Sequence, residues 1–215
     1  MIDHYRRRKA SYYWFKRAAA SVKVLVRSRG EALITRVAND TLVPHRVVVR
    51  CGWVRVDGTE LHMQSHSVSV PANGTAEVAR ELLPPSGARS PREWIYAAAL
   101  EADGLPPSQS IWPLAPHREL ALATPLISAR VVNGVLKVSS PVYCHGVHLE
   151  DGGRDILADN YFDLIPGLEQ QIRINHATST SEYPLTAMLP ISTKSARVVE
   201  GHGNGVERPA LTGQN

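Results

Sequence analysis

The chain has 215 residues, of which 43% are hydrophobic, 20% are charged and 6% are aromatic. This balance is typical of a globular protein and excludes a low-complexity or collagen-like chain. No apolar run approaches the roughly 20 residues that span a bilayer, so we expect no membrane-spanning segment.

The formal net charge of +4 is unevenly distributed. Residues 1–30 contain nine Lys or Arg and a single acid, Asp3, a local balance of +8 that leaves about −4 for the remainder. Basic residues interleaved with aromatic ones, as in 5–9 and 12–17, are found in nucleic-acid binders. They are also found on a helix that docks its aromatic face on a neighbour, which is the interpretation we favour. No apolar core or cleavage site follows 1–9, so we expect no secretory signal and favour a cytoplasmic location.

The first elements expected are one helix and a series of strands. Tyr12, Phe15 and Ala19 recur at helical spacing, which predicts a helix ending near Ser21. From Val22 the apolar period becomes two, as in a strand. Further strand-like runs cover 31–39, 46–56, 60–70, 75–83, 93–101 and 108–113. About seven short strands at this spacing predict an immunoglobulin-like sandwich over residues 22–115.

Turn residues separate these runs. Asp57-Gly58 lies between two alternating segments, where glycine accepts the positive φ of a type I′ hairpin turn. Other turn signals are found at 39–44, at 71–74 and in the proline-rich stretch 84–87.

The second half of the chain repeats this pattern after a break. Five prolines between Pro106 and Pro125 interrupt the period, which predicts a linker over 116–124. Strand-like runs then cover 128–132, 135–139, 143–149, 171–175 and 185–189, with a hairpin signal at Asn133-Gly134. Residues 201–215 are poor in apolar residues and are expected to be disordered. The predicted fold is all-β: a short helix within 1–21 and two tandem immunoglobulin-like sandwiches over 22–115 and 125–200.

Three stretches carry a family resemblance. They are the basic aromatic segment 7–18, the group formed by 37–42, 54–58 and 68–75, and the segment 158–167 (Ala-Asp-Asn-Tyr-Phe-Asp-Leu-Ile-Pro-Gly). Together they resemble the C-terminal region of family-two glycoside hydrolases, in the β-mannosidase and exo-β-glucosaminidase branch. Segment 158–167 is the most specific of the three, and the resemblance covers about residues 5–190.

The resemblance implies the closing helix of a catalytic barrel followed by the last two sandwiches of such an enzyme. A (β/α)₈ barrel needs about 250 residues, so this chain contains none. The family's catalytic acid/base is a glutamate that follows an asparagine, and no Asn-Glu dipeptide occurs here, so no catalytic residue is expected. The implied role is a non-catalytic support for the barrel of a parent enzyme that cleaves terminal β-linked mannose or a related sugar.

Two other functions are consistent with the sequence. One is a separately encoded subunit that docks on a partner barrel through its N-terminal helix. The other is a free-standing carbohydrate-binding module, which would need exposed aromatic rings. The candidate rings are those of Trp53, Trp94, Trp112, Tyr143 and Tyr161, although tryptophan in a sandwich is more often part of the core. Nucleic acid is not an expected partner.

Acidic residues cluster only around one segment, at Asp155, Asp159 and Asp163. Glycoside hydrolysis needs two facing carboxyl groups, about 5 Å apart for retention and 6.5–9.5 Å apart for inversion. Because the three aspartates flank a predicted loop, we expect turn and capping roles. Calcium is the alternative, but the spacing lacks the alternating oxygen ligands of a recognised loop.

Two groups of potential metal ligands stand out. His62 and His66 lie on one face of a predicted strand, but no third ligand accompanies them. Cys144, His145 and His148 are close in sequence, but 145 and 148 point to opposite faces of a strand. We therefore expect no metal site and no cofactor.

The remaining motifs favour structural roles. Cys51 and Cys144 are the only cysteines and lie far apart, so we expect no disulfide and a reducing compartment. Asn39 and Asn73 fit the glycosylation pattern but fall on predicted turns. The sequence contains no Gly-x-Ser-x-Gly elbow and no glycine-rich phosphate loop, so it offers no support for nucleophilic or nucleotide chemistry.

Overall fold

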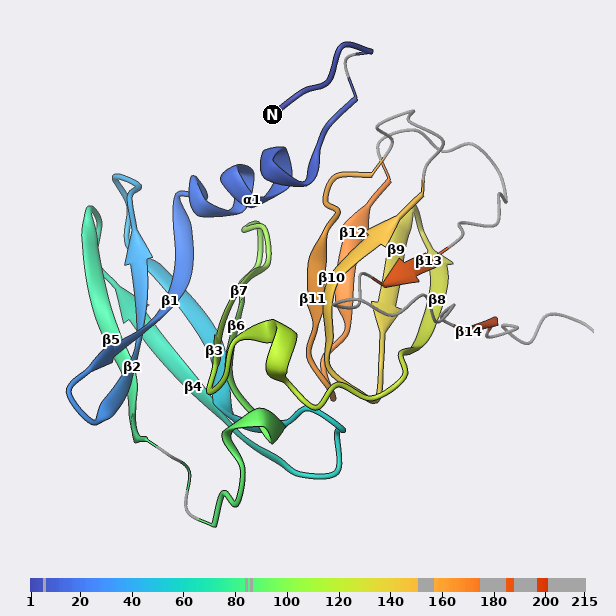
Figure 1. The fold of residues 1–215 in the computed structure, drawn as a ribbon. Helices are drawn as coiled ribbons and strands as arrows, with labels where there is room; N and C mark the ends of the chain where they lie inside the picture. Colours follow the sequence, from blue (N-terminus) through green and yellow to red (C-terminus); the bar gives the residue numbers. More distant parts are fainter. Residues whose placement is uncertain are drawn as a thin grey trace, which may run out of the picture.

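A computed structural model describes residues 1–5, 7–83, 85, 87–150, 157–174, 185–187 and 197–200. One helix, α1 (Ala10–Ala18), precedes two groups of strands, and each group forms two facing sheets (Figure 1). The predicted all-β class with a short N-terminal helix and two immunoglobulin-like sandwiches is confirmed. The predicted tail 201–215 lies outside the described residues. Within the described part of the chain, no helix has the length and apolar character needed to cross a membrane.

The first sandwich pairs a three-stranded sheet, β1-β2-β5, with a four-stranded sheet, β4-β3-β6-β7. Its alternating valines, such as Val22, Val24 and Val26, point into the core between the sheets and are buried. Period-two patterning therefore locates these strands correctly. Their bounds are β1 (Val22–Arg29), β2 (Ala32–Asn39), β3 (His45–Arg55), β4 (Leu61–Val70), β5 (Gly74–Leu82), β6 (Trp94–Glu101) and β7 (Ser108–Pro113).

Strand β6 is buried on both faces. Trp94 and Tyr96 point into the core of the first sandwich, while Ile95 and Ala97 face a second apolar cluster shared with the other sandwich. That cluster also contains Val54, Val56, Ala115, Leu120, Tyr143 and Ile165. A strand covered on both faces reads as a continuous apolar run, and small alanines allow the second layer to approach closely. This explains the alanine-rich sequence of β6.

The second sandwich is built from the sheets β12-β9-β8-β14 and β11-β10-β13. Its core includes Ile127, Leu136, Val147 and Phe162. Strand β14 pairs with β8 in parallel, whereas the other pairs are antiparallel. The bounds are β8 (Leu126–Val132), β9 (Val135–Ser139), β10 (Cys144–Leu149), β11 (Phe162–Leu164), β12 (Gln170–Arg173), β13 (Leu185–Ala187) and β14 (Arg197–Glu200).

The two predicted hairpin turns differ in the structure. Asn133 and Gly134 form a two-residue turn between β8 and β9, with φ of 51° and 73°, as expected for type I′. Asp57-Gly58 also lies between two paired strands, β3 and β4, and Gly58 has the expected positive φ of 76°, but the connection covers residues 56–60, so the type I′ turn type is wrong there. The Asp57 Oδ1 accepts hydrogen bonds from the Thr59 backbone N–H (3.1 Å) and hydroxyl (2.7 Å), and this local turn lengthens the loop.

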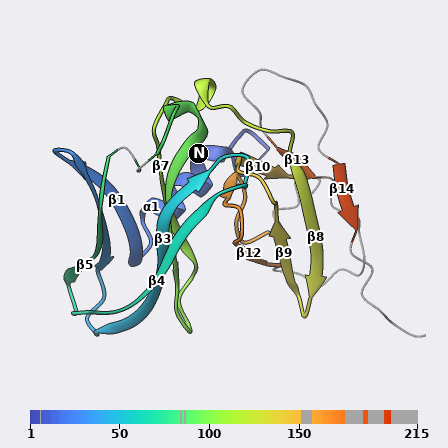
Figure 2. The same cartoon turned by 90° about the horizontal axis from the view of Figure 1, so that it is seen from below.

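The sandwiches contact each other directly and share α1. The backbone N–H of Tyr143 donates to the carbonyl of Val56 across the interface, at 2.9 Å. Figure 2 shows the four-stranded sheet of the first sandwich facing the second sandwich. Helix α1 lies across one end of this arrangement, between β1 and β7 on one side and β10 and β11 on the other (Figure 1).

Candidate functional site

Helix α1 is anchored to the second sandwich by its inner face. Tyr13 is buried, and its ring lies 6.0 Å from that of Tyr161, centre to centre. Arg17 donates hydrogen bonds to the carboxylate of Asp159 (2.6 Å) and to the carbonyls of Asn160 (2.9 Å) and Tyr161 (2.8 Å). Segment 158–167, the most specific part of the resemblance, therefore begins with the residues that hold the helix.

The outer face of α1 carries aromatic residues that the described chain covers only in part. The side chains of Trp14 and Phe15 are 54% and 60% exposed, and Ala18 and Ala19 on the same side are also exposed. We call these four residues the α1 outer face. The helical pattern of Tyr12, Phe15 and Ala19 indicated the helix, but it is Tyr13, outside that pattern, which packs inward. Large apolar groups gathered on a surface mark an interaction site.

Beside the helix, three polar side chains from separate segments meet. His117 belongs to a short 3₁₀ segment (His117–Glu119) in the linker, His145 to β10 and Asp163 to β11. The two imidazole rings stack with centres 3.8 Å apart. Nδ1 of His145 lies 2.8 Å from Oδ1 of Asp163.

Asp163 makes the largest number of hydrogen bonds in this group. Its Oδ1 also accepts a hydrogen bond from the backbone N–H of Gly146 (2.8 Å), and its Oδ2 accepts one from the hydroxyl of Tyr143 (3.0 Å). Burial acts to raise the pKa of Asp163, but the hydrogen bond and charge of His145 outweigh it and hold the pKa below its ordinary value. The lowered pKa favours the ionised carboxylate, which three neighbouring groups contact through hydrogen bonds.

The two histidines are shifted in opposite directions. Burial acts to lower the pKa of His145, but the Asp163 carboxylate outweighs it and raises that pKa. Burial lowers the pKa of His117, and the neighbouring His145 lowers it further. These shifts favour a charged His145 beside the Asp163 carboxylate and a neutral His117 stacked on it.

A cavity of about 220 Å³ opens next to this group. Its walls come from α1, from both sandwiches and from the linker: Trp14, Arg17, Gln109, Ile111, His117, His145, Tyr161, Phe162 and Asp163. The Trp14 ring meets that of His145 edge-on at 6.2 Å. The three-residue group is therefore accessible from the side on which the α1 outer face lies.

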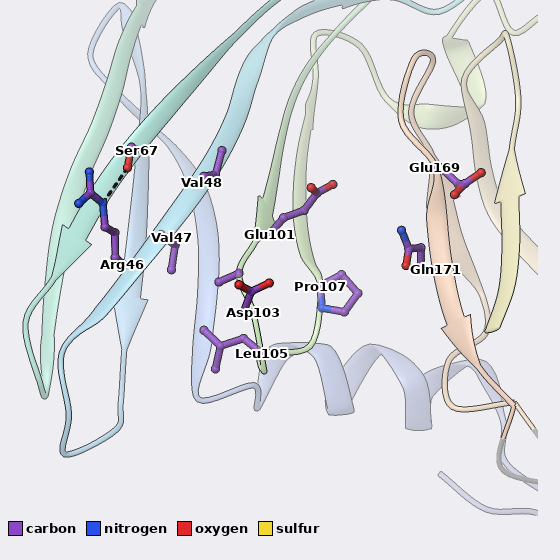
Figure 3. Close-up of a pocket in the computed structure, with 11 residues that line it drawn as sticks. Arg46, Val47, Val48, Ser67, Glu101, Asp103, Leu105, Pro107, Glu169 and Gln171 are labelled. Carbon is purple, nitrogen blue, oxygen red and sulfur yellow. Dashed lines mark hydrogen bonds between the residues drawn. The ribbon is translucent and has the colours of Figure 1, made fainter. Parts of the chain in front are cut away.

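A larger cavity, of about 550 Å³, lies between the two sandwiches (Figure 3). Glu101 and Asp103 line it from the first sandwich, and Glu169 and Gln171 from the second. No aromatic ring is among its lining residues, so it lacks the stacking platform on which sugars usually bind. Glu169 is paired with Arg130 and, at 3.2 Å, with Lys137.

Most of the aromatic residues considered for sugar stacking are inside the protein. Trp53, Trp94 and Tyr143 are buried, and Trp112 is partly buried against the core of the first sandwich. Tyr161 is partly buried and adopts a positive φ of 53°. The core interpretation therefore holds for the tryptophans of both β3 and β6.

The histidine and cysteine groups weighed as metal ligands, from which no metal site was expected, do not form a cluster of three among the described residues. The ring of His62 stacks on Trp94, whereas that of His148 stacks on Tyr161. Cys144 is buried and its thiol donates to the hydroxyl of Ser140, at 3.4 Å. Of these residues only His145 belongs to the group formed with His117 and Asp163. His117 lies in the predicted linker, and no spacing in the sequence indicated that it would lie near His145.

The turn and capping roles predicted for the aspartates and asparagines agree only in part with the structure. Asp155 lies outside the described residues, Asp159 binds Arg17, and Asp163 lies within a strand rather than capping a turn. Asn39 is buried, and its amide donates to the carbonyls of Val43 and Pro71, so a turn role explains it. Both cysteines are free and buried, in different sandwiches.

Comparisons with known proteins agree with the fold. Residues 35–117 match the Mannosidase Ig/CBM-like domain family. A search of curated protein sequences finds no match. The β-D-mannosidase from Dictyoglomus thermophilum superposes with a TM-score of 0.75 at 20% identity, over 92% of this chain and 24% of that chain. The exo-chitosanase CsxA of Amycolatopsis orientalis superposes with a TM-score of 0.57 at 16% identity, over 80% and 25%.

The chain thus spans about a quarter of the length of these enzymes. At such identities the superpositions show the fold, and the family match adds a domain type to the first sandwich. Residues 35–117 therefore match a mannosidase Ig/CBM-like domain, and the chain shares its fold with about a quarter of a β-D-mannosidase and of an exo-chitosanase.

Proposed function

We propose that this chain is a non-catalytic accessory region of a β-mannosidase-type glycoside hydrolase, and that it docks on the catalytic barrel through the α1 outer face. The observation that supports this most is the pair of exposed rings, Trp14 and Phe15, on a helix that is anchored from behind. An aromatic side chain buries about 150–250 Å² when it is covered. Because each ring is already about half covered, burying both would remove roughly 150–300 Å² of surface from water, which favours a permanent neighbour.

The anchoring contacts suggest what the helix does. Arg17 ties α1 to Asp159 and to two backbone carbonyls of the second sandwich. A barrel that packs on the outer face would be connected through the helix to the second sandwich rather than to a flexible tether. The chain would then act as a rigid buttress for the barrel.

The parent activity is proposed from the relatives. Those with the same fold are a β-D-mannosidase and an exo-chitosanase, so cleavage of a terminal β-linked mannose or glucosamine is the activity we propose for the whole enzyme. The same docking face would serve if the barrel were encoded on a separate chain. The burial of Trp53 and Trp94 argues against a free-standing carbohydrate-binding module.

Self-association of the isolated chain tests the docking face. We expect sedimentation velocity to show concentration-dependent association, because an uncovered aromatic patch pairs with other apolar surfaces. The double variant Trp14→Ser/Phe15→Ser should weaken this association about tenfold or more. The matched control is Leu82→Ser/Val131→Ser, which removes two exposed side chains (71% and 52%) that lie on β5 and β8 rather than on α1. Equal effects of the two double variants would contradict a specific role for α1.

A further inference from the structure

The group formed by His117, His145 and Asp163 has a composition that suits a metal ion. One potential ligand atom from each residue lies within 4.8 Å of those of the other two. Two imidazoles and one carboxylate are the donor set of many sites for divalent transition metals. We propose that these three residues bind a divalent transition-metal ion, with Zn²⁺ as the best fit.

Zinc binding requires local rearrangement, because the rings of His117 and His145 stack with centres 3.8 Å apart and planes at 20°, so their in-plane lone pairs do not yet converge on one point. With bonds of about 2.0–2.1 Å, ligand atoms around a tetrahedral Zn²⁺ stand roughly 3.4 Å apart. The Nδ1 of His145 and the Oδ1 of Asp163, now 2.8 Å apart, would need to separate by about 0.6 Å. His117 belongs to the short linker segment, so its ring can adjust toward an ion held by the two strands. Zn²⁺ has no electronic preference for one geometry and tolerates such adjustment.

The surroundings already orient the carboxylate. The hydroxyl of Tyr143 and the backbone N–H of Gly146 donate to its two oxygens, at 3.0 Å and 2.8 Å. Outer-shell hydrogen bonds of this kind fix ligands in established metal sites. Strands β10 and β11, which carry His145 and Asp163, are paired with each other, so two of the three ligands stand on a rigid base.

The site also has an entrance and an open side. The adjacent cavity of about 220 Å³ has room for an entering ion and for water as a fourth ligand. Arg17 lines the same cavity, but its charge is balanced by the Asp159 carboxylate at 2.6 Å. The metal would therefore not face an uncompensated cation.

An ion held there would connect the linker to the second sandwich. His117 follows the last strand of the first sandwich, whereas His145 and Asp163 belong to the second. Binding would therefore fix the relative position of the two sandwiches and stabilise the folded chain by mass action.

Titration of the chelator-treated full chain with ZnCl₂ tests this proposal. We expect a saturable one-to-one binding isotherm in calorimetry. At a free Zn²⁺ concentration a hundred times Kd, we also expect a rise of about 5–10 °C in Tm. Co²⁺ in place of Zn²⁺ should give visible d–d absorption of a low-coordinate site.

Three variants make the test specific. His117→Gln keeps a group able to hydrogen-bond Tyr143, so it should fold while weakening Zn²⁺ binding about tenfold or more and abolishing the Co²⁺ spectrum. Asp163→Asn should weaken binding similarly, with circular dichroism to verify folding. His66→Gln, on β4 and outside the group, is the control and should bind as the unmodified chain does. Absence of saturable binding by the unmodified chain, or unchanged binding by His117→Gln, would overturn the proposal.

Discussion

Gly58 shows how one residue can serve a turn and an interface together. Its φ of 76° lies in the left-handed region that favours glycine, and a Cβ at this position would overlap the carbonyl oxygen of Pro141 in the second sandwich. Gly134 has a similar φ of 73°, but a Cβ there would meet no atom within 4 Å. An alanine at Gly134 would therefore cost only backbone strain, whereas an alanine at Gly58 would cost the same strain and a steric clash.

We predict that Gly58→Ala lowers the free energy of unfolding by about 2–4 kcal/mol, and Gly134→Ala by about 1 kcal/mol. The difference arises because only Gly58 touches the other sandwich. Urea denaturation followed by circular dichroism measures both values. Equal losses would show that the contact with Pro141 relaxes without cost.

Sequence reasoning succeeded at residues whose environment is set locally and failed where distant segments meet. The burial of Val22, Val24 and Val26 follows from their alternation. The meeting of His117, His145 and Asp163 depends on how the linker crosses the second sandwich, and no periodic pattern encodes that path. Segment 158–167 was recognised as specific, but its binding of Arg17 emerged only in three dimensions.

Helix α1 is held to the second sandwich by several polar contacts. Its inner face has only one buried residue, Tyr13, so the hydrogen bonds of Arg17 carry much of the docking. Arg17 and Asp159 are each only about a fifth to a quarter exposed, so removal of one partner leaves the other poorly solvated. Burial raises the pKa of Asp159, while Arg17 acts to lower it, which shows the carboxylate's dependence on that partner.

We predict that Arg17→Ala lowers the free energy of unfolding by about 1–3 kcal/mol and exposes α1 to limited proteolysis. The matched control is Arg36→Ala, which removes an exposed ion pair with Glu77 and should cost less than about 1 kcal/mol. Thermal denaturation and protease digestion of the two variants provide the comparison. A helix that stays protected in Arg17→Ala would mean that its other contacts hold it, namely the buried Tyr13 and the hydrogen bond from Lys16 to the carbonyl of Ala158 (2.7 Å).

The apolar and polar pattern of the sequence located some features of the helices and strands and missed others. Strands of the first sandwich were found because each has one polar and one apolar face, or two apolar ones as in β6. The sequence predicted a type I′ turn at Asp57-Gly58. In the structure the connection is longer, because the backbone N–H and hydroxyl of Thr59 donate to the Asp57 carboxylate and form a different local turn. The helix was expected, but its inward face was not, since the aromatic residues Tyr12, Tyr13, Trp14 and Phe15 surround the helix axis.

The whole molecule has two apolar surfaces of different kinds. One is the contact between the two sandwiches, and the other is the exposed α1 outer face. The first is complete within the chain, because Ile95, Ala97 and Tyr143 are already buried there. The second is incomplete, because Trp14 and Phe15 face outward. The open surface is the one that the proposed docking on a barrel would cover.

The size of the native polypeptide tests the central claim most directly. An antibody raised against this 23.6 kDa chain would be used to probe an extract of the source cells by immunoblotting. Since the chain spans about a quarter of the enzymes with the same fold, we predict a band about four times larger. A single band near 23.6 kDa would contradict a covalently attached barrel and would direct attention to a separately encoded partner.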